Sequence, residues 1–501
     1  MRKPTTSETN TLRGKDWQSG ATRGLAFLFG VLWLSGCAVG PNYVKPDVAI
    51  EQKFESVEPN TYTEENAVAQ FWMQFNDETL NKLVADSLDA NHDLRIALAR
   101  FAEARASRRE SKFDLAPTIT ASGGYTEQRP DAQSRQALPG GEAKLYDAGF
   151  DAFWELDFFG RIRRNIEAAS ADAQSAEANL RNAQVVVIGE VARTYFELRG
   201  QQSQLDVARR NVENQRTTLN LTKVRLDAGR GTELDTSRAQ AQLSATLRTI
   251  GPLEAAVARS IHSLSVLTGR EPTALTPTLS TPQALPALPQ VIAVGNPADL
   301  LRRRPDIHAS ERDLAASTAR IGIAVADLFP KVTFTGSLGY SAVNSGDLGE
   351  AGTGTRLIAP GISWAAFDLG RVHTRIVGAR ARTEASLATY QQTVLRALQE
   401  TEDALVTHAR QRESLEYAAE SAQASNTAAR LAHARFDGGI VDFLEVLDAE
   451  RTQLEAEDRL AQSRTDTATS LIAVYKALGG GWQEAPFPHR VPLAAVSSRS
   501  R

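Results

Sequence analysis

Acidic side chains gather in one short stretch near the C-terminal end of the chain, "VDFLEVLDAE". Glu445 and Asp448 are three residues apart and share one face if the stretch is helical. Asp442 lies just before them, and Asp235 occupies the matching place in a related stretch 210 residues upstream. Carboxylates presented together can attract and select cations. The alternative interpretation is that they are solvated acids on an exposed helix end.

No other group of residues predicts catalysis or metal binding. The 7 histidines are scattered without the spacing of a metal site, and the glycines of "GRGTELD" lack the Lys-Ser/Thr pair of a phosphate-binding loop. We therefore expect no enzyme activity, no cofactor and no metal. The formal net charge of −4 shows no basic excess, so no nucleic-acid partner is expected either.

The single cysteine, Cys37, ends an N-terminal apolar segment. The run Leu25–Leu34 is too short to cross a bilayer, because a helical span needs roughly 20 residues. Basic residues precede the run and small residues follow it, as in a secretory signal peptide. "LSGC" resembles the bacterial lipobox, which implies removal of residues 1–36 and lipid attachment at Cys37. The alternative is an unlipidated signal with a chance cysteine.

The rest of the chain contains the same pattern twice. "WELDFFGRIR" resembles "WAAFDLGRVH", and "RLDAGRGTELDTSRAQ" resembles "RFDGGIVDFLEVLDAE", both at an offset of 210 residues. "DLAP" and "DLFP" match at an offset of 213. Matches in the same order predict two copies of one structural unit, residues 92–270 and 306–478. The other parts are an N-terminal segment 37–91, a linker segment 271–305 whose proline-rich stretch 272–290 is expected to be extended, and a tail 479–501.

Each copy has the pattern of a long helix that turns back on itself. Within 159–228, apolar or small residues alternate in steps of four and three, which is the heptad of a coiled coil. The glycines of "DAGRG" and "DGG" can cap a helix and allow a turn. We therefore predict antiparallel hairpins that pair 159–228 with 232–268 and 370–437 with 441–477. The first helix would extend roughly 100 Å at about 1.5 Å per residue.

Two alternating segments precede each long helix, and they predict four strands over about 117–127, 147–158, 331–342 and 357–367. Strands of about ten alternating residues suit a tilted membrane strand, although a single such hairpin would favour a soluble one. Four strands cannot close a barrel, and an open sheet edge cannot face lipid. Several copies would therefore have to share one barrel. Three copies would supply twelve strands, while strand count also permits dimers or tetramers.

Aromatic residues mark the ends of the predicted strands. Trp154 and Trp364 occupy equivalent places just before the two long helices. Tryptophan is common at membrane–water interfaces because its ring is amphipathic, and core packing below the barrel is the alternative. Tyr125 and Tyr340 are further candidates for aromatic contacts near the barrel.

These stretches resemble the outer-membrane efflux channels of the TolC/OprM type, in particular the lipoprotein branch of NodT-type outer-membrane factors. The resemblance covers residues 37–482 and is carried by "GCAVGPNYVKP", "FWMQFNDETLNKLVADSLDANHDLRIALAR", "WELDFFGRIRR", "RFDGGIVDFLEVLDAERTQL" and "ADLLRRRPDI" followed by "LFP". It implies a mainly α fold with a small β part. Long antiparallel coiled-coil hairpins and four transmembrane β-strands per chain would form a trimeric 12-strand β-barrel and an α-barrel.

The resemblance implies the exit duct of a tripartite efflux pump, which conducts small molecules passively and supports antibiotic resistance. The duct would sit in the cell outer membrane as a lipid-anchored homotrimer, with its helical tube in the periplasm. Its partners would be outer-membrane lipid, a periplasmic membrane-fusion adaptor and an inner-membrane pump of the RND type. The alternatives are an outer-membrane duct for type I protein secretion and a non-channel coiled-coil scaffold lipoprotein.

The resemblance also places Glu445 and Asp448 at the periplasmic aperture, where acidic rings narrow the closed channel. Some family members lock this turn with a Tyr and an Arg, and the matching positions here are Phe436 and Val441. Neither side chain can make the polar links. We therefore predict that closure depends on the acidic rings and on apolar packing of Phe436, Val441, Phe443 and Leu444.

Overall fold

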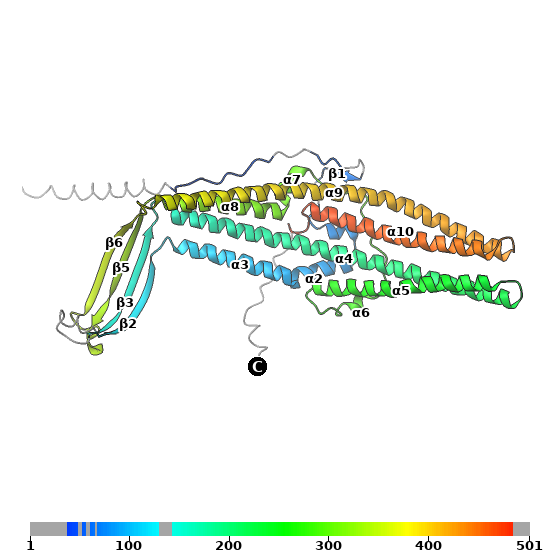
Figure 1. Ribbon diagram of the computed structural model, residues 1–501, viewed down its shortest axis with the longest axis horizontal. Helices are drawn as coiled ribbons and strands as arrows, with labels where there is room; N and C mark the ends of the chain where they lie inside the picture. The colour runs from blue at the N-terminus through cyan, green and yellow to red at the C-terminus, as the bar shows by residue number, and fades with distance from the viewer. Residues whose placement is uncertain (1–37, 49–52, 57–60, 66–67, 130–142, 484–501) are drawn as a thin grey trace, which may run out of the picture. The chain divides into compact units, whose positions relative to one another are not determined.

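The computed structural model describes residues 38–48, 53–56, 61–65, 68–129 and 143–483 (Figure 1). Cys37 and the signal segment lie outside the described residues. Most of the described chain is helical and a small part is sheet, which confirms the predicted class. The chain divides into two compact units. The first holds the described residues up to 44 with 106–171 and 315–385, and the second holds the remainder.

The first unit contains an antiparallel four-stranded sheet in the order β2-β3-β5-β6. Its strands are β2 (Thr118–Gln128), β3 (Ala143–Leu156), β5 (Lys331–Ala342) and β6 (Gly354–Ser363), with a short 3-10 helix, η3 (Ser345–Asp347), between the last two. Within the described residues, β2 pairs only with β3 and β6 only with β5. Both outer edges of the sheet are therefore without a neighbouring strand in the described chain.

The two faces of this sheet differ in polarity. In the β3–β5 register Phe150 lies opposite Leu338, and Trp154 lies opposite Phe334. The same face carries Ile358 and Ile362 of β6, and Phe150, Leu338, Ile358 and Ile362 are all more than 60% exposed. The opposite face holds polar residues that include Thr120, Asp147, Asp151, Glu155 and Thr333. A large apolar surface is thus left uncovered in the single chain.

The motif "WELDFFGRIRR" forms the junction from β3 into the long helix α4 (Arg161–Asp227). Asp157 accepts hydrogen bonds from the backbone N–H groups of Ile162 and Arg163, both at 3.0 Å, and so caps the start of the helix. Gly160 has a φ of 80°, and a Cβ there would lie 2.5 Å from the Cα of Ala38. The turn therefore requires glycine at this position.

The buried Arg164 side chain holds the first described residues of the chain against this junction. Its guanidinium donates to the carbonyl of Val39 at 3.0 Å, to the carbonyl of Gly40 at 3.2 Å and to Asn42 Oδ1 at 2.8 Å. Gly40 meets α8 (Pro305–Ala326), where a Cβ on Gly40 would lie 2.5 Å from the Cα of Gly322. The segment that follows Cys37 is therefore fixed in the first unit.

The second unit contains the turn ends of both helical hairpins. In the first, α4 packs against α5 (Glu233–Leu267); in the second, α9 (Leu369–Asp437) packs against α10 (Phe443–Ala477). The pairs run antiparallel (Figure 1), and the Arg209–Glu254 ion pair at 2.7 Å joins α4 to α5. Along α4, the predicted heptad positions Val191, Leu198, Leu205, Val212 and Leu219 are all buried.

The main core of the second unit forms where the motif "FWMQFNDETL" meets the long helices. The motif folds as η1 (Phe71–Phe75) followed by α2 (Glu78–Ala90). Phe71 stacks on Tyr475 with a centroid distance of 4.8 Å, and Phe75 packs edge-on against Phe196 at 4.9 Å. Asp77 caps α2 through the N–H of Leu80 and accepts the hydroxyl of Tyr195 at 2.7 Å. The N-terminal segment is thereby joined to α4 and α10.

Several elements were absent from the sequence analysis. α3 (His92–Phe113) and α8 precede the first strand of each repeat, and α3 has almost no amphipathic periodicity that could have predicted it. The prediction that the proline-rich linker is extended was wrong at α6 (Thr276–Leu279), because prolines at the first turn are compatible with a short helix. The linker region also contains α7 (Pro297–Arg303) and β4 (Ile292–Ala293), which pairs in parallel with β1 (Tyr62–Thr63).

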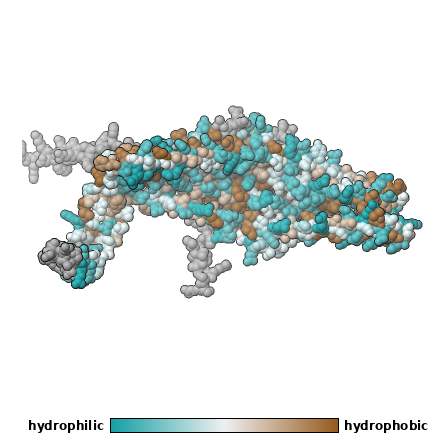
Figure 2. All heavy atoms as spheres, in the orientation of Figure 1, coloured by the Kyte–Doolittle hydropathy of each residue, from teal (hydrophilic) through white to brown (hydrophobic). Residues whose placement is uncertain are grey.

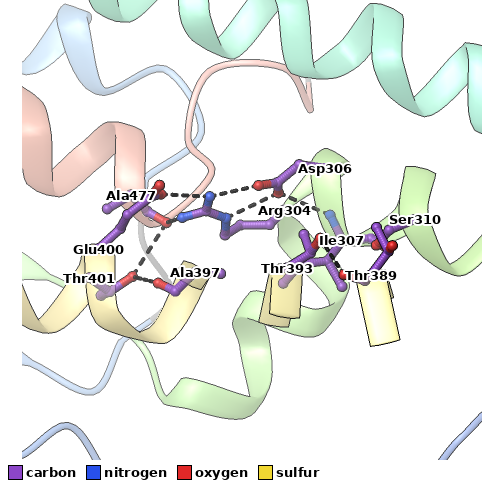
Figure 3. A network of polar contacts seen from close by, with 10 residues as sticks. All are labelled: Arg304, Asp306, Ile307, Ser310, Thr389, Thr393, Ala397, Glu400, Thr401 and Ala477. Atoms are coloured by element: carbon purple, nitrogen blue, oxygen red, sulfur yellow. Dashed lines mark hydrogen bonds and ion pairs between the residues drawn. The ribbon is translucent and has the colours of Figure 1, made fainter. Parts of the chain in front are cut away.

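Arg304 joins the end of the linker to the long helices (Figure 3). Pro305 disfavours a helical conformation at Arg304, so α7 ends there in extended geometry. The guanidinium pairs with Asp306 at 2.7 Å and with Glu400 of α9 at 2.8 Å. It also donates to the carbonyl of Ala477 at 3.1 Å, at the end of α10. The motif "RRRPDI" therefore joins α8, α9 and α10.

Arg164→Ala is expected to lower the free energy of unfolding by about 3 kcal/mol, because it removes a buried guanidinium together with its charge-assisted hydrogen bonds to Val39, Gly40 and Asn42. Chemical denaturation of the purified protein, with a spectroscopic probe of helix content, measures the change. Arg371→Ala is the matched control, since this arginine forms a mostly exposed ion pair with Asp368 and its loss should cost less than about 1 kcal/mol. Equal effects of the two substitutions would contradict the role given to Arg164.

Candidate functional site at the two helix–helix turns

Both hairpins turn through the same backbone geometry. Gly229 and Gly439 have φ angles of 64° and 71°. Three residues after each helix ends, the N–H of Arg230 donates to the carbonyl of Arg225 at 2.8 Å, and the N–H of Ile440 donates to the carbonyl of Arg435 at 2.9 Å. These bonds define a Schellman motif, in which a left-handed glycine closes the helix. The resemblance between the two repeats therefore extends to individual backbone hydrogen bonds.

The two turns use their equivalent acids differently. Asp235 forms a capping box with Thr232, whose hydroxyl donates to the Asp235 carboxylate at 2.7 Å. Glu445, at the same place in the second copy, accepts instead from Arg435 at 2.8 Å. Asp448 accepts from Arg451 at 2.7 Å, and Asp442 is the exposed N-cap residue of α10. The second turn thus presents its carboxylates to solvent, whereas the first uses Asp235 to begin α5.

An apolar cluster lies between the two hairpins beside these turns. Phe436 is 6% exposed, and its ring centroid is 5.6 Å from that of Phe443. We call this group the tip cluster, and it consists of Val212, Leu219, Ala239, Leu243, Ala432, Phe436, Phe443 and Val446. Because its members come from α4, α5, α9 and α10, the tip cluster holds the two hairpins together.

Val441 and Leu444 were both predicted to pack near Phe436, but the two side chains differ in burial. Val441 is partly buried against the tip cluster. Leu444 is 51% exposed, so the prediction that it belongs to the apolar packing was wrong. It follows Phe443 by one position and therefore points about 100° away around the helix. Figure 2 shows other hydrophobic side chains reaching the surface near the turns.

Arg225 makes a contact between hairpins that the sequence analysis missed. Its guanidinium lies 3.9 Å from the centroid of the Phe436 ring and donates to the Phe436 carbonyl at 3.3 Å. A cation over an aromatic face is attracted by the ring quadrupole. Phe436 therefore does take part in a polar link, with its face and carbonyl. The sequence contained one indication that Arg225 has a role at the turn, because Arg225 and Arg435 occupy the same place in the two repeats.

The two equivalent tryptophans make equivalent hydrogen bonds in the first unit. Trp154 Nε1 donates to the carbonyl of Leu115 at 3.0 Å, and Trp364 Nε1 donates to that of Leu328 at 2.9 Å. The first bond joins the end of β3 to the "DLAP" motif just before β2. The second joins the end of β6 to the "DLFP" motif just before β5. Trp364 is 54% exposed and Tyr125 and Tyr340 about half exposed, so all three rings face outward.

The described residues contain no cluster of three or more His, Cys, Asp or Glu side chains able to hold a metal ion. Of the helices in the described chain, none is both long and apolar enough to cross a membrane.

The repeated strand-and-hairpin units place this chain in a known class. It belongs to the outer membrane efflux protein family, which it matches over residues 83–270 and 296–480. The resemblance found in the sequence is thereby confirmed.

Individual relatives agree with this assignment. The chain is 32% identical over 459 residues to the probable efflux pump outer membrane protein TtgC of Pseudomonas putida, which covers 90% of this chain and 94% of TtgC. It is 29% identical over 458 residues to nodulation protein T of Rhizobium leguminosarum bv. trifolii, with 91% and 96% covered. The solved structure of the outer-membrane channel OprN is 42% identical, has a TM-score of 0.83, and covers 89% of this chain and 100% of OprN.

Phe436→Ala is expected to destabilise the protein by about 3 kcal/mol, because it removes a buried ring from the tip cluster together with its contact to Arg225. Thermal or denaturant unfolding measures the loss. Leu444→Ala removes an apolar side chain of the same turn that is half exposed, and should change stability by no more than about 0.5 kcal/mol. If the two variants unfold alike, the tip cluster does not hold the hairpins together.

Proposed function

We propose that this protein is the outer-membrane exit duct of a tripartite efflux pump and that it conducts small molecules passively. The observation that carries the proposal is the four-stranded sheet of the first unit. It has one mainly apolar and one mainly polar face, with exposed apolar side chains on the first, and two edges without a neighbouring strand within the described residues. An apolar face suits lipid and a polar face suits a water-filled lumen. A periplasmic scaffold would leave the exposed apolar face unexplained.

The unpaired edges support assembly of several copies. Every backbone group of a membrane strand must be hydrogen bonded, so the free edge of β2 needs the free edge of β6 from another copy. We propose a homotrimer with a 12-strand β-barrel and an α-barrel of the helical hairpins. Strand count would also allow two or four copies, and the choice of three follows from the family resemblance.

The same resemblance supports the partners. Relatives such as TtgC are named as outer membrane proteins of efflux pumps, so we propose that a periplasmic membrane-fusion adaptor and an RND-type inner-membrane pump deliver the exported molecules. We also propose that Cys37 carries lipid. Trp154, Trp364, Tyr125 and Tyr340 would meet the membrane interface, which the outward-facing rings of the last three favour.

We assign the periplasmic aperture to the two helix–helix turns. In a trimer each exposed carboxylate becomes a ring of three, and such rings attract cations. Glu445, Asp448 and Asp442 would form these rings, while Asp235 would add charge from its capped position. Phe436 and Val441 would maintain closure through the tip cluster, with Arg225 in place of the polar lock of other family members.

The purified protein should migrate as a trimer that dissociates on heating, and it should conduct ions in a planar bilayer. Removing two ring charges with Glu445→Gln and Asp448→Asn should lower cation over anion selectivity severalfold, because six carboxylates leave the trimeric aperture. Reversal potentials in a salt gradient measure this selectivity. A monomer that does not conduct would refute the duct itself.

Glu455→Gln is the matched control for the ring acids. Glu455 is also exposed on α10, about two helical turns beyond Asp448, and its ion pair with Arg459 is long at 3.9 Å. Its loss should leave selectivity unchanged. If Glu455→Gln has the same effect as the double variant, the aperture is not formed by Glu445 and Asp448.

Cys37→Ala, expressed behind a standard cleavable signal, is expected to reduce the amount of trimer in outer-membrane fractions several-fold. Single-channel conductance of the trimers that form should not change, because a barrel contributes far more apolar contact than acyl chains do. Quantitative blotting and bilayer recordings provide the two measurements. Normal assembly with lost conductance would mean that the lipid acts on the channel itself.

A further inference from the structure

A buried carboxylate connects three helices above the turns. Glu450 of α10 is 5% exposed. Its Oε1 accepts a hydrogen bond from the Thr218 hydroxyl of α4 at 2.7 Å and forms an ion pair with His433 Nε2 of α9 at 2.9 Å. Glu450 thus contacts the first hairpin through Thr218 and its own hairpin through His433. A buried charge of this kind is stable only while it is paired.

The same residues line a polar cavity of about 390 Å³. Within the described residues, Glu450 Oε2 has no hydrogen-bond partner, and neither polar atom of the Gln215 side chain has one. Gln215 comes from α4 and is 3% exposed. Unsatisfied buried polar atoms are costly, and a roomy polar site can admit water to pair with them. The contact between the hairpins at this level is therefore polar and easily hydrated, unlike the tip cluster.

The charged groups around His433 come from two of the three helices. Arg430 and Asp437 lie on α9 with His433, and Glu450 lies on α10. Glu457 lies about two helical turns further along α10. Its carboxylate accepts hydrogen bonds from the side-chain amides of Asn211 of α4 and Asn426 of α9. The cavity residues contributed by α4 are the uncharged Asn211, Asn214, Gln215, Thr217 and Thr218. Glu450 is therefore the charged group that contacts His433 directly.

The hydrogen bond to Glu450 raises the pKa of His433 above its ordinary value of 6.5, although burial lowers it; the charges of Glu450 and Asp437 also raise it. The protonated contact therefore stabilises the folded arrangement fully below about pH 6.5 and is lost as the pH rises through the raised pKa. His408 of α9 behaves in the opposite way. Burial lowers its pKa to about 4, so this histidine is neutral around pH 6.5 and does not follow the change of His433.

We propose that His433, Glu450 and Thr218 form a proton-controlled latch between the two helical hairpins. Protonated His433 neutralises Glu450 and holds its carboxylate where Thr218 of the other hairpin reaches it. When His433 loses its proton, Glu450 becomes an unbalanced buried charge that draws water into the adjoining cavity and loosens the contact. The latch is a property of the folded chain, and its effect on conduction rests on the proposed function.

Hydrogen exchange on the purified full-length protein tests the latch without reference to conduction. The segments to follow are 211–222 of α4 and 429–437 of α9. At about pH 5.5, exchange in His433→Gln should be about fivefold faster than in the wild type, the factor expected for one partly exposed ion pair. At about pH 8.5 the ratio should fall to about one, because the wild-type histidine is then neutral. Comparison at equal pH cancels the intrinsic pH dependence of exchange.

Two further variants test whether the effect depends on the charge of Glu450 and on the position of the histidine. Glu450→Gln preserves shape but removes the charge, so its exchange at low pH should match that of His433→Gln. His373→Gln removes an exposed histidine from the same helix and should behave like the wild type. A variant-to-wild-type ratio that is the same at both pH values for His433→Gln would overturn the latch, as would an equal effect of His373→Gln.

Bilayer recordings then test the functional consequence. Wild-type trimers should conduct more at about pH 8.5 than at about pH 5.5, and His433→Gln trimers should lose this dependence. A wild-type conductance that does not change with pH would show that the latch does not control the duct. If the trimers do not conduct at all, the proposed function fails, while the exchange experiment still decides whether the latch exists.

Discussion

No strand of the described chain pairs with the outer edge of β2 or of β6, so these edges lack the ladder hydrogen bonds of a continuous sheet. Each unpaired group of this kind costs several kcal/mol when it is removed from water. The sheet also leaves its apolar face exposed. A single chain satisfies neither requirement, whereas strands of further copies and surrounding lipid satisfy both. The need to pair these edges is the constraint on which the proposed assembly of several chains into a duct depends.

Duplication explains the architecture, and the differences between the copies explain how the two hairpins divide their roles. Both turns close with the same Schellman hydrogen bonds, and both tryptophans donate to equivalent carbonyls. Asp235 is occupied in a capping box, whereas Glu445 and Asp448 remain exposed to solvent. The first hairpin therefore uses its acid within its own turn. The second presents its acids to solvent and contacts the first hairpin through Phe436 and Glu450.

Local patterns were enough to predict most of the fold. The heptads of α4, the αL glycines of both turns and the alternation of the four strands depend on neighbouring residues, so the sequence reveals them directly. α3 was missed because its polar residues surround the helix without a preferred face. Leu444 was misplaced because a shift of one residue changes its direction on the helix. The candidate acids were found, but their partners Arg435, Arg451 and Thr232 were not, since side-chain pairing depends on geometry.

The order of the helices and strands, their duplication and the glycine turns follow from the amino-acid sequence, because each is encoded within a few residues. The contacts that join distant parts appear only once the chain has folded. Arg164 reaches the carbonyl of Val39 across 125 positions, Arg225 reaches Phe436 across 211, and Thr218 reaches Glu450 across 232. No local pattern encodes such pairs. Packing of the two hairpins decides which side chains meet, and therefore which acids stay exposed and which become buried.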